Sequence, residues 1–262
     1  MRGRESQLNM RHLRRPRHDA SVLLVPDFGQ EHLSVDPLSL KESWSELVGS
    51  QSPLPTLVEP TSMPAVSSPV AERLVPIDHP RISTVEAYRL SGWTAAIDGM
   101  WLRSSAMERL GGVVDRLGPR FGLHVFDAWR PLQLQAELYE AAYADPSLPQ
   151  GFVSEPTESP LTPPPHLTGG TVDLTLTLDG IPLSLGTSFD DFSLAAHADS
   201  LEMSPSPARD LRRLLYHAMR AEGFVVLDCE WWHYEYGTRR WAALTGNEPL
   251  YGPASLDVRL SE

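Results

Sequence analysis

Two short stretches of the chain contain the residue types of a metal site with a catalytic base. The first, PPPHLTGGTVDLTL, contains His166 and Asp173, and the second, CEWWHYEYG, contains Glu230 and His233. Imidazoles and carboxylates are common ligands of catalytic zinc, which takes three protein ligands and keeps a fourth position for water. We therefore expect His166, Asp173 and His233 to hold one zinc ion, and Glu230 to take a proton from the water that the ion activates.

Such a ligand set would leave the site with a net positive charge, which favours hydroxide and polarises a scissile carbonyl group. Each residue also has a simpler interpretation when it is taken alone. An isolated histidine is more often a structural hydrogen-bonding residue, and an aspartate on the polar face of a strand is usually solvated. Cys229 is interpreted as a small buried hydrophobic residue. The residue types alone leave both interpretations open.

The elements that must position these residues are strands. Residues 171–178 alternate between polar and apolar side chains, which predicts a half-buried strand with Asp173 on its polar face. A second strand is predicted from Phe224 through Tyr236. On a regular strand Glu230 and His233 would point to opposite faces, because an offset of three is odd. Both can approach one metal only if the regular ladder is broken between them, so we predict such a break.

The remaining pattern predicts an α+β fold, a mostly antiparallel sheet flanked by helices in a single catalytic domain. Asp179 and Gly180 predict a hairpin turn after the first strand. Residues 145–165 are rich in Pro, Ser and Thr and predict a long loop that covers a site or is mobile. The other expected elements are a helix over 104–117, a strand over 122–128, a helix opened by Pro131, and a helix capped by Ser206 and ended by Gly223.

The N-terminal part of the chain has a different composition. Residues 1–74 are predicted to be a basic leader followed by a Pro- and Ser-rich extension, largely irregular apart from a short helix around residues 43–48. Residues 75–262 are predicted to form the catalytic domain. The sequence does not say whether the extension folds over the site.

The composition of the 262 residues excludes several classes of function. A formal net charge of −12 argues against nucleic acid or an anionic membrane surface as a partner. No stretch approaches the roughly 18 apolar residues of a membrane span. The single cysteine excludes an intrachain disulfide and, with no secretion signal visible, favours a cytoplasmic location. The oligomeric state is left open.

The two stretches resemble the signature motifs of the D-alanyl-D-alanine dipeptidases, zinc enzymes of the vancomycin-resistance type whose patterns read SxHxxGxAxD and ExWH. FDAWRP and GTSFDDF are similar to the family's DGYRP and GSRFDFM in the same order. The resemblance extends over roughly residues 90–236. It implies a zinc dipeptidase whose ligands are His166, Asp173 and His233, with Glu230 as general base and acid.

The same resemblance implies roles for two further residues. Arg130 would stabilise the oxyanion of the tetrahedral intermediate, a role that suits a permanently charged planar donor; its simpler role would be a structural ion pair with Asp127. Asp190 would hold the free ammonium group of a dipeptide substrate, with Asp191 as a competitor. One departure concerns the substrate: Pro164 occupies the place of the family's serine, so the dipeptide preferred here can differ.

Three functions therefore stay under consideration. The leading one is zinc-dependent hydrolysis of D-alanyl-D-alanine or a related small dipeptide. The second is a related zinc D,D-carboxypeptidase or endopeptidase acting on cell-wall peptides, which would need an open groove. The third is a catalytically inactive, zinc-stabilised binding module. The retention of Glu230 and Arg130 argues against the third, because a structural zinc site uses four protein ligands and needs no base.

Overall fold

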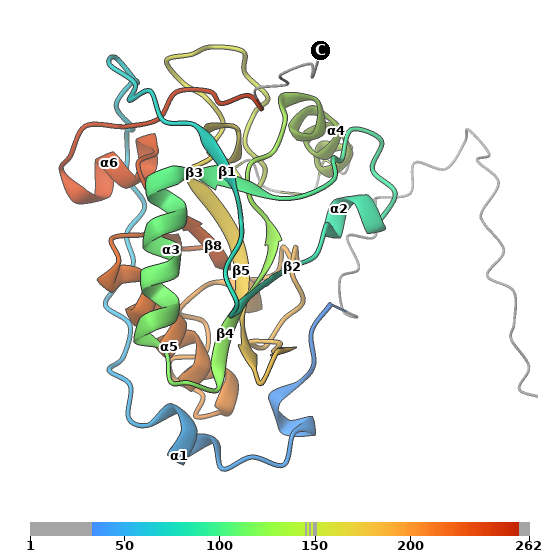
Figure 1. Ribbon diagram of the computed structural model, residues 1–262, viewed down its shortest axis with the longest axis vertical. Coiled ribbons are helices and arrows are strands. Elements are labelled where there is room, and N and C mark those ends of the chain that lie inside the picture. Colours follow the sequence, from blue (N-terminus) through green and yellow to red (C-terminus); the bar gives the residue numbers. More distant parts are fainter. Residues whose placement is uncertain (1–32, 145, 147, 149–150, 257–262) are drawn as a thin grey trace, which may run out of the picture.

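A computed structural model describes residues 33–144, 146, 148 and 151–256 (Figure 1). Its centre is a six-stranded sheet with the strand order β2–β4–β5–β8–β7, in which β6 pairs with β5. The strands of this sheet are β2 (Ile82–Thr84), β4 (Phe121–Asp127), β5 (Thr171–Leu178), β6 (Ile181–Pro182), β7 (Val225–Leu227) and β8 (Glu230–Glu235). A separate antiparallel pair is formed by β1 (Leu74–Pro76) and β3 (Trp101–Arg103).

Helices pack against this sheet. The two longest, α3 and α5, contact each other and lie together against the sheet in Figure 1. The helices are α1 (Trp44–Val48), α2 (Ala87–Leu90), α3 (Ser104–Arg116), α4 (Leu132–Tyr143), α5 (Pro207–Ala221) and α6 (Arg239–Thr245), with 3-10 turns η2 (Pro37–Ser39), η3 (His166–Thr168) and η4 (Leu194–Ala196).

The sequence pattern explains where α5 begins and which face it buries. The Ser206 hydroxyl accepts a hydrogen bond from the Arg209 amide, and Pro207 occupies the first turn, where its missing N–H costs nothing. The residues buried against the sheet, Leu211, Leu215 and Met219, recur at helical spacing. The four predicted helices, which were expected to begin near residues 43, 104, 131 and 206, are confirmed as α1, α3, α4 and α5.

The sheet is mixed: one of its five strand pairings is parallel, which the prediction did not include. β2 pairs with β4 in parallel, whereas β4–β5, β5–β6, β5–β8 and β7–β8 are antiparallel. The combination of helices and a sheet is confirmed. The parallel pair escaped prediction because β2 has only three residues, too few to show a period.

Two strand predictions need correction in detail. The hairpin turn at Asp179 and Gly180 is confirmed, and both residues have positive φ. However, β5 is buried on both faces rather than half-buried. Asp173 lines the pocket, and the Thr175 hydroxyl donates to the Leu183 carbonyl oxygen instead of to water. The strand predicted over 224–236 is two antiparallel strands, β7 and β8, joined by a turn at residues 228–229.

Residues 49–73, which we call the arm, contain no helix or strand and run along the surface of the domain. Leu54 and Val66 of the arm are buried, and the Val66 amide donates to the Leu161 carbonyl at 2.9 Å. A domain boundary at residue 74 stays a prediction. The expected basic leader lies outside the described residues up to residue 32.

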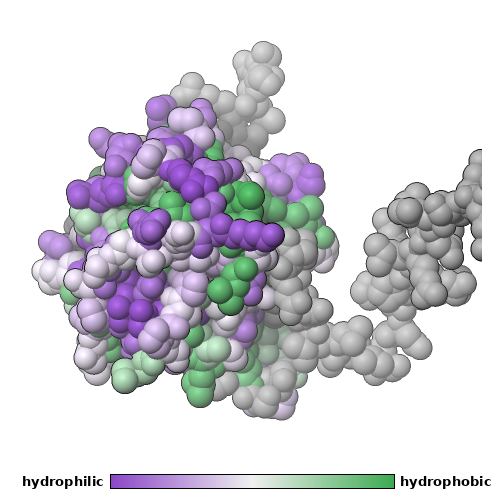
Figure 2. All heavy atoms as spheres, turned by 90° about the horizontal axis from the view of Figure 1, so that it is seen from below, coloured by the Kyte–Doolittle hydropathy of each residue, from purple (hydrophilic) through white to green (hydrophobic). Residues whose placement is uncertain are grey.

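On the face seen from below, polar and apolar residues are interspersed (Figure 2). Among the described residues, no helix combines the length and the apolar character that crossing a membrane requires.

Candidate metal centre

One row across the central sheet brings together residues from three strands. Asp173 of β5 lies opposite Asp127 of β4 on one side and opposite His233 of β8 on the other. A register shift between Val125 and Asp127 leaves Phe126 without a partner. This bulge turns Asp127 to the face that carries Asp173, and directly opposed residues of neighbouring strands share a face.

His166 reaches the same place from η3, just before β5. Its Nδ1 lies 2.7 Å from the Ala128 carbonyl oxygen, so the ring donates there and its Nε2 is free to bind a metal. Gly169 follows with φ +72° and ends the turn. At Gly170 a Cβ would clash with the Tyr236 carbonyl oxygen, so only glycine lets the two backbones come this close.

The three expected ligands converge. One ligand atom from each of His166, Asp173 and His233 lies within 4.8 Å of the other two. The His166 Nε2 is 3.3 Å from Asp173 Oδ2, and the His233 Nδ1 is 3.0 Å from Asp173 Oδ1. Ligands at about 2.1 Å from a tetrahedral zinc ion are about 3.4 Å from one another. The spacing of these atoms therefore suits one metal ion.

The donor set also fits a cation on chemical grounds. Asp173 Oδ1 is buried and accepts no hydrogen bond, although His233 Nδ1 lies 3.0 Å away, so this acceptor is available to a cation. Burial alone would raise the pKa of Asp173, yet it lies well below its ordinary value because His166 and His233 favour the carboxylate. The pocket is also lined by six carboxyl side chains, namely Glu59, Glu155, Asp173, Asp190, Glu230 and Glu235.

Glu230 shares this face because of a second irregularity. Between β7 and β8 the register shifts so that Val226 opposes Tyr234 while Leu227 opposes Glu230. The predicted break in the ladder between Glu230 and His233 is confirmed. The Glu230 Oε2 lies 3.6 Å from His233 Nδ1, and burial raises the pKa of the Glu230 carboxyl to about 7. A carboxyl poised near neutrality can both accept and return a proton.

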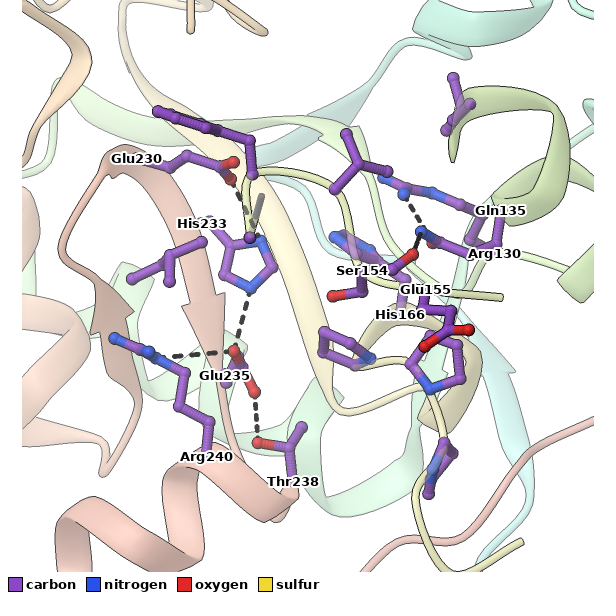
Figure 3. Close-up of a pocket in the computed structure, with 18 of the residues that line it drawn as sticks. Arg130, Gln135, Ser154, Glu155, His166, Glu230, His233, Glu235, Thr238 and Arg240 are labelled. Carbon is purple, nitrogen blue, oxygen red and sulfur yellow. Dashed lines mark hydrogen bonds and ion pairs between the residues drawn. The ribbon is translucent and has the colours of Figure 1, made fainter. Parts of the chain in front are cut away.

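A third carboxylate, Glu235, orients His233 from the opposite side (Figure 3). The His233 Nε2 lies 3.1 Å from Glu235 Oε1 and donates to it, which leaves Nδ1 free for a metal. The Thr238 hydroxyl donates to Glu235 Oε2. Glu235 was not among the predicted site residues, although a residue two positions after His233 on the same strand must share its face.

Arg130 lies beside the cluster at the turn between β4 and α4. Its guanidinium pairs with Asp127 at 2.7 Å and donates to Gln135 Oε1 at 2.9 Å and to the Tyr88 hydroxyl at 3.2 Å. It also lies 3.8 Å from Asp173 Oδ2 and lines the pocket. The ion pair with Asp127 considered from the sequence thus exists and holds the guanidinium at the site. Tyr88 and Gln135 were not expected there.

Asp190 and its neighbour Asp191 lie in different surroundings. Asp190 lines the pocket with φ +58°, and its Oδ2 is buried without a hydrogen bond. Burial, reinforced by Asp173 and Glu230, raises the pKa of Asp190 well above its ordinary value. Asp191 instead accepts a hydrogen bond from the Ser193 amide at 2.8 Å and does not line the pocket. Of these two aspartates, therefore, only Asp190 presents its carboxyl group to the pocket.

The cluster opens into a cavity of about 470 Å³. One wall is the loop of residues 151–165, which includes Pro164 in the place of the family's serine. Of the two possibilities predicted for this Pro-rich segment, covering a site or being mobile, its described part agrees with the first, because it lines the cavity. A cavity of this size suits a small molecule rather than a folded protein.

Comparison with known proteins identifies the same region. Residues 117–245 match the family model described as D-ala-D-ala dipeptidase. A D-alanyl-D-alanine dipeptidase of Synechocystis sp. is 28% identical over 54% of this chain and 71% of its own length. One from Escherichia coli is 36% identical over 43% of this chain and 54% of its own length. The resemblance found in the sequence is thereby confirmed: this region is similar to the D-ala-D-ala dipeptidases, a family of metallopeptidases.

Proposed function

We propose that this protein is a zinc-dependent dipeptidase that hydrolyses D-alanyl-D-alanine or a related small dipeptide. The observation that carries the proposal is the convergence of His166, Asp173 and His233 beside a buried Glu230 in a small-molecule cavity. The similarity to the D-ala-D-ala dipeptidases supports it, since both relatives bear the name of this activity.

His166 Nε2, His233 Nδ1 and a carboxylate oxygen of Asp173 would hold the zinc ion. When bound, the ion would lower the pKa of a coordinated water molecule and polarise the scissile carbonyl group. The hydrogen bonds from His166 to Ala128 and from His233 to Glu235 fix each ring with its free nitrogen toward the cluster. The chain therefore presents its ligands already oriented.

Glu230 would carry the proton. It begins as a carboxylate, accepts a proton at Oε2 as water attacks the carbonyl carbon, and passes that proton to the leaving amine. A pKa near 7 suits both transfers, because neither the carboxylate nor the acid is strongly favoured at neutral pH. Its Oε2 lies 3.6 Å from His233 Nδ1, so the carboxylate is already beside the proposed ligands.

Arg130 and Asp190 would hold the substrate. The Arg130 guanidinium, fixed by Asp127, would donate to the oxyanion that develops on the carbonyl oxygen. The Asp190 carboxyl group, whose Oδ2 has no hydrogen bond, would bind the ammonium group of the dipeptide, and that positive charge would favour the carboxylate form that burial disfavours. This selects peptides whose amino group is one residue from the scissile bond.

Replacement of Glu230 tests the proposal. Glu230→Gln should keep one zinc ion per chain and lose about 100- to 10,000-fold in kcat on the preferred dipeptide, because the proton acceptor is gone. Zinc content and turnover are measured on the same sample. Glu108→Gln, which removes an exposed carboxylate of α3, is the control. Full activity in Glu230→Gln would refute the proposed mechanism.

A substrate panel separates the proposal from its alternatives. D,D-, L,D- and L,L-dipeptides and longer cell-wall peptides are compared at equal enzyme concentration. Preference for a dipeptide supports the proposal, and faster cleavage of the longer peptides supports the carboxypeptidase or endopeptidase. Zinc binding without hydrolysis of any of them supports the inactive module. A cytoplasmic location remains part of the proposal and would supply the enzyme with free dipeptides.

A further inference from the structure

A segment outside the matched region reaches the metal centre. The match to the family begins at residue 117, whereas Glu59 and Met63 of the arm line the same cavity as the proposed ligands. The arm also contacts the loop that forms another wall, since Val66 donates to Leu161. The arm is therefore part of the pocket.

The start of α6 holds the arm in place. The Arg239 side chain donates to the carbonyl oxygens of Pro64 at 2.8 Å and Met63 at 3.0 Å. Two nitrogens of the Arg240 guanidinium pair with the two carboxylate oxygens of Glu59. Glu59 Oε1 also accepts a hydrogen bond from the Asp228 amide at 3.2 Å. Glu59 is thus tied to both α6 and the turn between β7 and β8.

Arg240 lies between two carboxylates. Its Nε is buried without a hydrogen bond and lies 3.7 Å from Glu235 Oε1, the oxygen that accepts from His233 (Figure 3). Burial lowers the pKa of Arg240 to about 10, which still leaves it a cation at neutral pH. A buried cation needs a counter-charge, and here Glu59 supplies the paired one.

If Glu59 lost its charge, Arg240 would have Glu235 as its remaining carboxylate partner. Arg240 would then move closer to Glu235 and compete with His233 Nε2 for the same acceptor, Glu235 Oε1. The imidazole would then lose the partner that sets its tautomer and its orientation. Glu59 thus influences His233 without touching it.

We propose that Glu59 is a positioning residue of the metal centre: by pairing with Arg240, it leaves Glu235 available to orient His233. This rests on the proposed function, in which His233 is a zinc ligand. It assigns to the arm a part in zinc binding that the residues of the matched region do not supply alone.

Zinc affinity of the full chain, measured by competition with a chelator, tests the proposal. Glu59→Gln should weaken zinc binding about 3- to 10-fold, less than the 10- to 100-fold expected for Glu235→Gln, which removes a direct partner of a ligand. The absorption spectrum of the cobalt-loaded protein should change in Glu59→Gln, because it reports the ligand geometry. Melting of the metal-free variants shows whether they are folded.

Glu72→Gln is the matched control. Glu72 also anchors the arm, by accepting hydrogen bonds from Ser104 and Ser105 at the start of α3, but it neither lines the cavity nor contacts Arg240. It should leave zinc affinity unchanged. An equal loss in Glu72→Gln and Glu59→Gln would overturn the proposal, since general loosening of the arm would then explain both.

A double-mutant cycle tests whether Glu59 acts on His233 through Glu235. If Glu59 acts through Glu235, adding Glu59→Gln to Glu235→Gln should not weaken zinc binding further. Additive losses, or unchanged zinc affinity in Glu59→Gln, would refute the positioning role while the dipeptidase proposal stands. A wild-type chain that binds no zinc would refute both, whereas zinc binding without hydrolysis would refute only the dipeptidase.

Discussion

At the residue scale, the carboxylates of the pocket differ in their partners and hence in their chemistry. Asp173 lies between two imidazoles, which favour its charged form, whereas burial raises the pKa of Glu230 to about 7. Glu235 is hydrogen-bonded to His233 and Thr238, and Asp190 keeps an unpartnered oxygen. These environments suit a ligand, a base, an orienting group and a substrate contact, respectively.

The unpartnered oxygen of Asp190 leads to a prediction about substrate binding. Asp190→Asn removes the charge that would pair with the substrate ammonium, so KM for the preferred dipeptide should rise about 10-fold or more, as expected for a charged hydrogen bond worth about 1.5–3 kcal/mol. Zinc affinity should stay the same, because Asp190 is not among the proposed ligands. Steady-state kinetics and chelator competition give the two values.

Asp191→Asn is the control for this experiment, because its carboxylate caps a local turn outside the pocket. It should leave KM close to the wild-type value. A rise in KM in Asp191→Asn but not in Asp190→Asn would show that Asp191, rather than Asp190, contacts the substrate ammonium.

At the element scale, the site depends on two departures from regular strand pairing. The bulge in β4 turns Asp127 toward Asp173, and the register shift in β8 brings Glu230 to the face of His233. The second could be predicted, because an odd offset between two residues required at one site demands it. The first could not, since nothing in the sequence said that Asp127 had to share a face with Asp173.

Close backbone contact at Gly170 is a second requirement at this scale, and it predicts a loss of stability. Gly170→Ala places a Cβ against the Tyr236 carbonyl oxygen, next to the β5–β8 pair. Because backbone cannot yield as a side chain can, the free energy of unfolding should fall by about 2 kcal/mol or more. Urea unfolding of the metal-free protein measures it.

Gly180 provides the comparison, because it has φ +82° with open space around its Cβ position. Gly180→Ala should cost only about 1 kcal/mol, the cost of a left-handed backbone conformation. Equal losses in the two variants would show that the backbone contact at Gly170 is not what requires glycine there.

At the scale of the whole molecule, the cavity is assembled from segments that are distant in the sequence. The proposed ligands come from η3, β5 and β8, while walls come from the arm and from residues 151–165. Local motifs predicted the ligand cluster because their chemistry lies in short, recognisable stretches. The contribution of the arm had no such signal: a Pro- and Ser-rich segment shows no period, and only the fold reveals that Glu59 meets Arg240.

Both proposals require one metal ion held by the three ligands of the cluster. Anomalous diffraction at the zinc edge, from crystals of the full chain grown with zinc, would locate that ion. One strong peak is expected about 2.0–2.2 Å from His166 Nε2, His233 Nδ1 and an oxygen of Asp173. A cluster without a peak in such crystals, or a peak coordinated by other side chains, would contradict both proposals.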